Sequence, residues 1–152
     1  MAANRALIPN PALQPLKFLV GEWTLRGSHP AVPGVTLHGH SSVVWLDGGA
    51  FLRMESAIDD KRFPNGIAII GSDGDELSML YFDERKVSRH YRVAVTETGW
   101  RWWRDDDKLA QRFTVTLEDG GNTMAGKGEM SRDGGAWEGD LDLTYTRASG
   151  RS

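Results

Sequence analysis

Apolar and polar positions alternate in short runs along most of the chain, and turn residues separate the runs. From Gly21 onward the alternation has a period of two, as in strands that bury one face, and no segment has the length and period of a long helix. The breaks, such as "LDGG", "SDGDE" and "EDGGN", are rich in Gly, Asp and Asn. The pattern predicts ten strands, at about residues 22–28, 35–46, 50–58, 66–72, 76–83, 86–96, 99–104, 110–118, 122–131 and 136–147.

The short links between these runs favour consecutive antiparallel hairpins. A twisted sheet of this size tends to curl or close, and closure removes its exposed edges. We therefore expect an all-β protein, a single antiparallel up-and-down barrel of about ten strands. We assign it to residues 16–147, with an irregular N-terminal arm over 1–15 and a C-terminal tail over 148–152. A short helical turn at residues 15–20 is expected before the first strand.

The last strand has the clearest two-sided pattern. One side of it is expected to face the barrel interior, and the other side carries Glu, Asp and Thr. The residues predicted for the inner side are Trp137, Gly139, Leu141, Leu143 and Tyr145.

Composition narrows the class of partner. The chain has 152 residues, of which 39% are hydrophobic and 26% are charged, as in soluble proteins with a sizeable core. Its net charge of −3 and the lack of a basic block argue against nucleic acid as a partner. No apolar stretch approaches the roughly 18 residues of a membrane span. With no cysteine and no secretory signal pattern, we expect a cytoplasmic protein without disulfides or thiolate metal sites.

Two segments far apart in the chain carry a family resemblance. "FLVGEWTLRG" places Gly21 and Trp23 after an apolar turn, and "LTYTR" ends the last strand with Arg147. This arrangement resembles the calycins, the superfamily of lipocalins and fatty-acid-binding barrels. In calycins the Trp closes one end of the barrel and the Arg packs on it. The resemblance thus implies that Gly21, Trp23 and Arg147 form a closure device.

The chain also resembles uncharacterised bacterial proteins of the DUF1579 type, from "FLVGEWTL" through "WLDGGAFLRMES" to "GAWEGDLDLTYTR". This likeness implies a lipocalin-like or fatty-acid-binding-like barrel and no established activity. A weaker similarity is to nitrobindin, a ten-stranded barrel that holds haem through a His late in its chain. Here the last histidine is His90, so the sequence departs from that pattern. We expect no cofactor, and a nitrobindin-like haem barrel is kept as a second alternative.

A polar strand with aromatic residues supplies the first ligand-binding candidates. Arg89 and Tyr91 share one face of "KVSRHYRV", and Tyr81 lies on the preceding hairpin arm. Together they could form a pocket for a carboxylate, because Arg can donate two parallel hydrogen bonds and Tyr one directional bond. In "GWRWWRDD", Trp102 could line an aromatic wall. Packing on the barrel exterior is an equally open interpretation of this strand.

His38 and His40 share a strand face, which makes them weak candidates for a metal site, and solvent-facing histidines are the simpler interpretation. In "FLRMES", Arg53 and Glu55 face either the lumen or solvent, and the pattern does not decide which. His40 or Glu55 could serve as acid or base in an enzyme.

The preferred hypothesis is binding of a small hydrophobic or aromatic ligand, which can carry a carboxylate, inside the barrel. Its expected lining is Tyr81, Arg89, Tyr91, Trp102 and His40. The alternative is an isomerase or cyclase that folds its substrate in the cavity. No metal is expected, and the sequence does not distinguish a monomer from a homodimer.

Overall fold

Ten strands follow one another in the computed structural model, which describes residues 8–148. Each begins and ends within two residues of its predicted position. The strands are β1 (Gly21–Ser28), β2 (Leu37–Leu46), β3 (Phe51–Ile58), β4 (Gly66–Asp73), β5 (Glu76–Asp83), β6 (Val87–Thr96), β7 (Gly99–Arg104), β8 (Leu109–Glu118), β9 (Thr123–Arg132) and β10 (Glu138–Arg147). Two 3₁₀ helices accompany them, η2 (Pro11–Leu19) and η3 (Asp119–Gly121).

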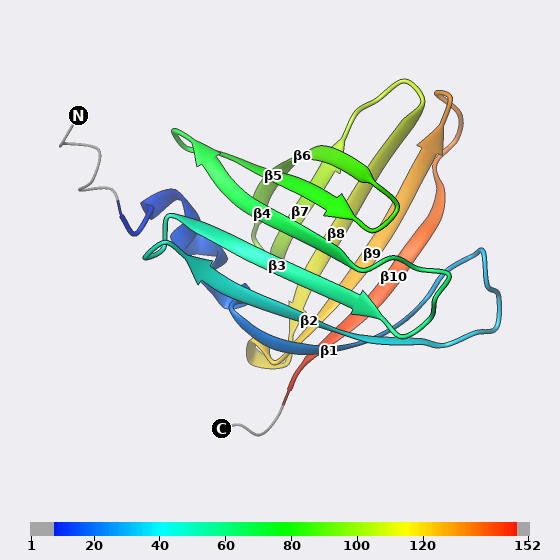
Figure 1. The fold of residues 1–152 in the computed structure, drawn as a ribbon, viewed down its shortest axis with the longest axis horizontal. Coiled ribbons are helices and arrows are strands. Elements are labelled where there is room, and N and C mark those ends of the chain that lie inside the picture. Colours follow the sequence, from blue (N-terminus) through cyan, green and yellow to red (C-terminus); the bar gives the residue numbers. More distant parts are fainter. Residues whose placement is uncertain (1–7, 149–152) are drawn as a thin grey trace.

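Every strand pairs antiparallel with its neighbours in the sequence, and β1 pairs with β10, so the sheet closes on itself (Figure 1). This confirms the predicted antiparallel up-and-down barrel. One end of the barrel is covered by η2, and the long β1–β2 connection lies at the other end (Figure 1). Within residues 8–148, no helix is long and apolar enough to span a membrane.

The N-terminal segment differs from the prediction. Helix η2 begins at Pro11, where an irregular arm was expected, and Asn10 caps it by accepting a hydrogen bond from the Ala12 N–H. Leu13, Leu16 and Leu19 are fully or almost fully buried. Their spacing of three matches the three residues per turn of a 3₁₀ helix, so all three face the barrel. The rest of the arm, residues 1–7, and residues 149–152 of the tail lie outside the described residues.

The covered end is sealed by contacts between the two ends of the barrel sheet. Trp23 lies opposite Arg147, is 1% exposed, and donates from Nε1 to the Leu19 carbonyl oxygen at 2.8 Å. The Arg147 guanidinium lies 4.3 Å from the centre of the Trp23 ring and donates to the carbonyl oxygens of Val20 and Phe18, at 2.9 and 2.7 Å. We call η2, Trp23 and Arg147 the plug.

Gly21 is required for this arrangement by both its backbone and its surroundings. Its φ of +136° is one that L side chains rarely adopt, and a Cβ there would lie 2.8 Å from Nη1 of Arg147. The structure therefore brings together the three residues that the calycin resemblance singled out.

Strand β10 contains an irregularity that the alternation did not predict. Its register with β9 shifts between Gly139 and Asp142. Leu141 and Leu143 line the barrel interior, but Trp137 precedes the strand and is 39% exposed. The Trp137 ring stacks with the Arg112 guanidinium, 3.9 Å away. The prediction that all five positions share one inner face is therefore wrong at the start of β10, the end away from the plug. A bulge there changes which face a side chain takes.

Candidate functional site

The end of the barrel opposite the plug contains a cavity of about 780 Å³. That volume is within the range of small-molecule sites, roughly 300–1,000 Å³. One wall is aliphatic and comes from β1, β3, β4 and β10. Its members include Leu25, Met54, Ile58, Ala68 and Leu143.

The facing wall is aromatic and runs across β5, β6, β7 and β8. Tyr81, Tyr91, Trp102 and Phe113 follow one another with ring centroids 6.3, 4.7 and 5.1 Å apart. Trp102 and Phe113 are cross-strand partners whose rings stack at 18°. The strand alternation turns all four rings inward, so they form an aromatic wall in which the near-parallel Trp102 and Phe113 rings offer a flat apolar surface to a ligand.

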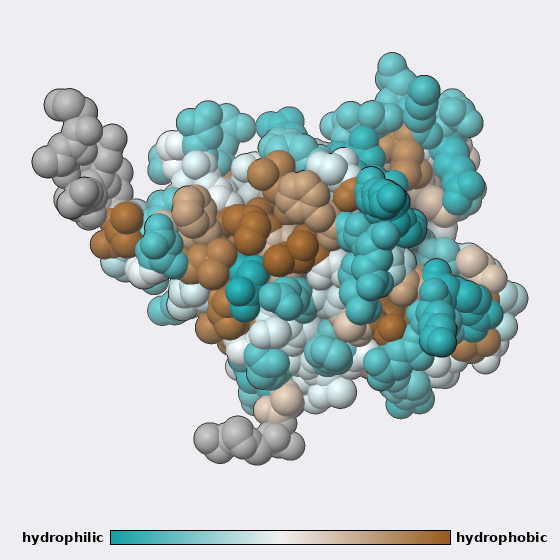
Figure 2. Space-filling view, viewed as in Figure 1, coloured by the Kyte–Doolittle hydropathy of each residue, from teal (hydrophilic) through white to brown (hydrophobic). Residues whose placement is uncertain are grey.

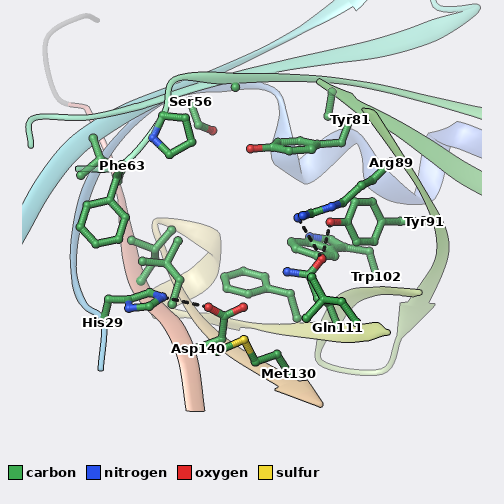
Figure 3. A pocket seen from close by; sticks show the side chains of 18 of the residues that line it. His29, Ser56, Phe63, Tyr81, Arg89, Tyr91, Trp102, Gln111, Met130 and Asp140 are labelled. Atoms are coloured by element: carbon green, nitrogen blue, oxygen red, sulfur yellow. Dashed lines mark hydrogen bonds and ion pairs between the residues drawn. The ribbon is translucent and has the colours of Figure 1, made fainter. Parts of the chain in front are cut away.

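A polar cluster interrupts this wall on one side of the cavity. Gln111 Oε1 accepts hydrogen bonds from the Tyr91 hydroxyl at 2.8 Å and from Arg89 Nη1 at 3.3 Å (Figure 3). Burial raises the pKa of Tyr91, so its hydroxyl keeps its proton and remains a donor. Arg89 and Tyr91 therefore converge on a single acceptor, as the carboxylate hypothesis requires of its donors.

Gln111 was not among the residues selected from the sequence, although a signal for it exists. It precedes Phe113 and Val115 by two and four positions on β8, and both of those residues are buried. The period of two that selects Phe113 and Val115 as inward-facing also selects Gln111.

Tyr81 lines the cavity but does not join Arg89 and Tyr91 in that cluster. Its hydroxyl donates to Asp83 Oδ2 at 2.8 Å, and Arg85 Nη2 donates to the same oxygen at 2.7 Å. The Tyr81 ring lies against Gly66, where a Cβ would come within 2.8 Å of ring carbon Cε1. Its hydroxyl proton is thus committed within the protein, and the expected three-residue carboxylate pocket is reduced to Arg89 and Tyr91.

The Tyr81–Asp83–Arg85 contacts also shift two pKa values. Burial, followed by the hydrogen bond to Asp83, raises the pKa of Tyr81 above its ordinary value. Hydrogen bonds from the Arg85 side chain, and then from the Tyr81 hydroxyl and the Arg85 backbone, lower the pKa of Asp83 to about 2. Tyr81 is therefore a neutral wall residue and Asp83 a carboxylate.

Cationic side chains outnumber acidic ones around the cavity. The acidic lining residues are Asp133 and Asp140. The cationic ones are Arg62, Arg85, Arg89, Lys108, Arg112 and Arg132. In a chain of net charge −3, this concentration favours the entry of an anion.

Three of these cations are already paired with carboxylates. Arg62 pairs with Asp60 at 2.6 Å, Arg85 with Asp83 at 2.7 Å and Arg112 with Glu129 at 2.9 Å. Among residues 8–148, no carboxylate oxygen lies within 4.0 Å of the side-chain nitrogens of the other three, Arg89, Lys108 and Arg132. Of those three, Arg89 also bonds to the polar cluster of the aromatic wall.

A histidine at the mouth is fully engaged by the protein. The Ala31 backbone N–H donates to Nδ1 of His29 at 3.0 Å, so Nδ1 carries no proton and Nε2 donates to Asp140 Oδ1 at 3.0 Å (Figure 3). The ring also packs against Phe63, with centroids 5.3 Å apart. Because both ring nitrogens are hydrogen-bonded within the protein, the pair ties the β1–β2 connection to β10.

His40 does not line the cavity, contrary to our expectation. On β2 the residues Gly39, Ser41 and Val43 are buried, so His38 and His40 point outward and are exposed. Glu55 is likewise exposed on the outer face of β3, paired with Arg53 at 3.0 Å. Neither His40 nor Glu55 is therefore positioned as an acid or base for a ligand in the lumen.

The arrangement of the histidines does not favour a metal site or a haem site. Across residues 8–148, no group of three or more His, Asp or Glu side chains is arranged to hold a metal ion. His90 lies on the exposed outer face of β6, because its neighbours Arg89 and Tyr91 face the cavity. Its imidazole therefore cannot reach a group bound in the lumen.

Fold and site together define a plugged, ten-stranded antiparallel barrel that holds a largely apolar cavity at its other end. No protein-family model matches the chain, and no curated protein matches it.

Proposed function

We propose that this protein binds a small hydrophobic or aromatic molecule with a carboxylate group inside the barrel. The apolar part would lie between the aliphatic wall and the Trp102 and Phe113 rings, and the carboxylate would take hydrogen bonds from Arg89 and Tyr91. The observation that carries the proposal is that these two donors meet at one point of an otherwise apolar wall.

Energetics favour an anionic head group at this point. A charged hydrogen bond is worth about 1.5–3 kcal/mol, which corresponds to roughly 10- to 150-fold in affinity. Arg89 has no carboxylate within 4.0 Å among the described residues, so a ligand carboxylate would supply a missing charge partner and displace none. The cationic mouth would raise the local concentration of such a ligand.

We also propose that the chain is a lipocalin-like or fatty-acid-binding-like member of the calycins, related to the DUF1579 type. The contacts of Gly21, Trp23 and Arg147 in the plug support this.

Matched acids and alcohols test the binding proposal. The probes are 2-naphthoate with 2-naphthylmethanol, and dodecanoate with 1-dodecanol, titrated against tryptophan fluorescence and checked by calorimetry. We expect the acids to bind more tightly than the alcohols. Arg89→Leu should weaken the acids by roughly 10- to 100-fold and leave the alcohols unchanged.

Arg92→Leu is the matched control, since Arg92 lies on the same strand but points outward with a side chain that is 63% exposed. It should bind all four probes as the wild type does. Absence of any binding by the wild-type protein would overturn the proposed function, and equal acid affinity in Arg89→Leu would remove Arg89 as the anchor.

A further inference from the structure

The outer face of β3, β4 and β5 carries an apolar patch, which we call the β3–β5 patch. Figure 2 shows apolar side chains gathered over these strands, between polar surroundings. Three of its members are strongly exposed: Phe51 at 43%, Leu80 at 47% and Phe82 at 45%. Ile67 and Ile69 of β4 complete it, and they pair across the strands with Phe82 and Leu80. A contiguous exposed apolar face of this kind marks an interaction surface.

The strand register gives the patch an internal symmetry. Met54, Ala68 and Tyr81 face inward and are aligned across β3, β4 and β5. Their immediate neighbours along each strand point outward, one on either side of this line. On one side the outward residues are Arg53, Ile69 and Leu80, and on the other side they are Glu55, Ile67 and Phe82.

We propose that the β3–β5 patch is the surface through which two copies of this chain associate, around a two-fold axis that runs along this line. Such an axis places each residue of one side against the residue of the other side in the second copy. Ile69 then meets Ile67, and Leu80 meets Phe82, so that the contact on β4 and β5 is apolar.

The charges at the edge of the patch identify a second copy as the occupant. Arg53 and Glu55 lie on opposite sides of the line, so the axis sets each Arg53 against Glu55 of the other copy. Within one chain these two side chains already form an ion pair at 3.0 Å, so association joins two such pairs into a ring of four alternating charges, from a surface that carries no net charge at this edge. Phe51 and Ala57 lie three positions from Met54 on opposite sides of the line, so the axis sets the exposed Phe51 of one copy against the smaller Ala57 of the other. A surface that complements itself in charge and in size is what an isologous interface requires.

The dimension of the face predicts a concentration-dependent dimer. Three strands, β3 to β5, about 4.8 Å apart and about eight residues long at about 3.3 Å each, cover roughly 400 Å². This is below the about 800 Å² per partner of standard stable interfaces. Monomer and dimer should therefore exchange at micromolar concentrations. The contact uses the outside of the barrel, so it leaves the cavity mouth open and does not depend on the proposed ligand.

Sedimentation velocity of the full chain between 1 and 300 µM tests this inference. The wild type should shift from monomer to dimer over this range, and Leu80→Glu should stay monomeric. Arg53→Glu alone and Glu55→Arg alone should each weaken association by at least about tenfold, because each places like charges together twice. The double variant Arg53→Glu/Glu55→Arg should return to within about threefold of the wild type.

Thr114→Glu, on the exposed outer face of β8, is the control for added charge and should dimerise as the wild type does. Circular dichroism and thermal melting confirm that each variant is folded. A wild type that stays monomeric at 300 µM would leave the patch to a different partner and overturn the proposal. So would assemblies larger than a dimer, or a double variant as weak as the single ones, because neither agrees with the two-fold arrangement.

Discussion

Gln111 shows how a single neutral side chain can set the head-group chemistry of the cavity. Its amide oxygen accepts hydrogen bonds from both Arg89 and Tyr91, so it stands where an oxygen of a ligand carboxylate would bind. It satisfies the Tyr91 hydroxyl, which belongs to a residue only 3% exposed, without neutralising the Arg89 charge. Because the acceptor at this point is neutral, Arg89 keeps a positive charge that an anionic ligand can neutralise. An acidic residue at position 111 would already pair with Arg89.

Gln111→Glu should therefore abolish the preference for acids. The new carboxylate would pair with Arg89 and repel a second one, so the affinity for 2-naphthoate should fall by more than about tenfold. The affinity for 2-naphthylmethanol should stay within about twofold. Calorimetric titration at pH 7 measures both.

Thr114→Glu adds the same charge to the opposite face of β8 and should change neither affinity. If Gln111→Glu binds naphthoate as the wild type does while Arg89→Leu does not, Arg89 recognises the acid without sharing its acceptor position with Gln111.

At the scale of the element, η2 and β1 act as one closing unit. The three leucines of η2 fill the end of the barrel, and Trp23 joins them to β10 through Arg147. The Arg147 guanidinium bonds to carbonyl oxygens at the end of η2 that would otherwise lack donors. The plug is thus held by apolar burial and by directional bonds at the same place.

Trp23→Ala should lower the free energy of unfolding by about 3–5 kcal/mol, because it removes a fully buried aromatic side chain and the ring under Arg147. Guanidinium unfolding followed by circular dichroism measures this. Trp137→Ala is the control, since its partly exposed ring stacks only outside the barrel, and it should cost no more than about 1 kcal/mol. Equal stability of Trp23→Ala and the wild type would contradict the role of the plug.

The β5–β6 turn contributes a pH-dependent part of the stability. The pKa of Asp83 is lowered to about 2 from an ordinary value of 3.8, chiefly by hydrogen bonds from Arg85. A lowered pKa in the folded state means that stability from this carboxylate is fully present above about pH 4 and is lost as the pH falls toward 2. Asp83→Asn should thus be less stable than the wild type at pH 7, by about 1–3 kcal/mol.

The stability difference between Asp83→Asn and the wild type should shrink steadily between pH 4 and pH 2, as measured by urea unfolding at each pH. Asp105→Asn, in the exposed β7–β8 turn, should follow the wild type over the whole range. A difference that persists unchanged at pH 2 would mean that the charge of Asp83 is not what stabilises the turn.

For the whole molecule, the local pattern was sufficient to predict the strands, and four of the five expected lining residues do line the cavity. Period-two alternation and turn residues are local signals, so they can be recognised within a single strand. On β6 and β7 the same alternation that turns one face inward places Arg89, Tyr91 and Trp102 on that face. His40 was wrongly placed inside because the inward phase of β2 runs through Leu37 and Val43, and the two inward residues between them, Gly39 and Ser41, carry no apolar side chain that marks it. Asp140 was missed because the bulge in β10 changes the phase within one strand.

The remaining errors come from features that a period of two does not describe. Leu13 follows the three-residue period of a 3₁₀ helix, which is rarely so long, and was assigned to an irregular arm, whereas the helical turn was expected only from residue 15. The pairing of Gln111 with Arg89 depends on contacts between strands that are not adjacent in the sheet. Such contacts depend on how strongly the sheet curves across β7, which the alternation of a single strand does not encode.

The pairing of β1 with β10 has a consequence for how the protein is made. Val20 and Arg147, which bond to each other in the plug, are 127 positions apart in the chain. Each hairpin from β1 to β9 can form from neighbouring residues as they leave the ribosome, because its contacts are local. The seam cannot close until β10 has been synthesised, so the growing chain carries an open sheet edge and an unsealed apolar interior for most of its translation. The final strand is thus the step at which a nascent, aggregation-prone sheet becomes a barrel without edges.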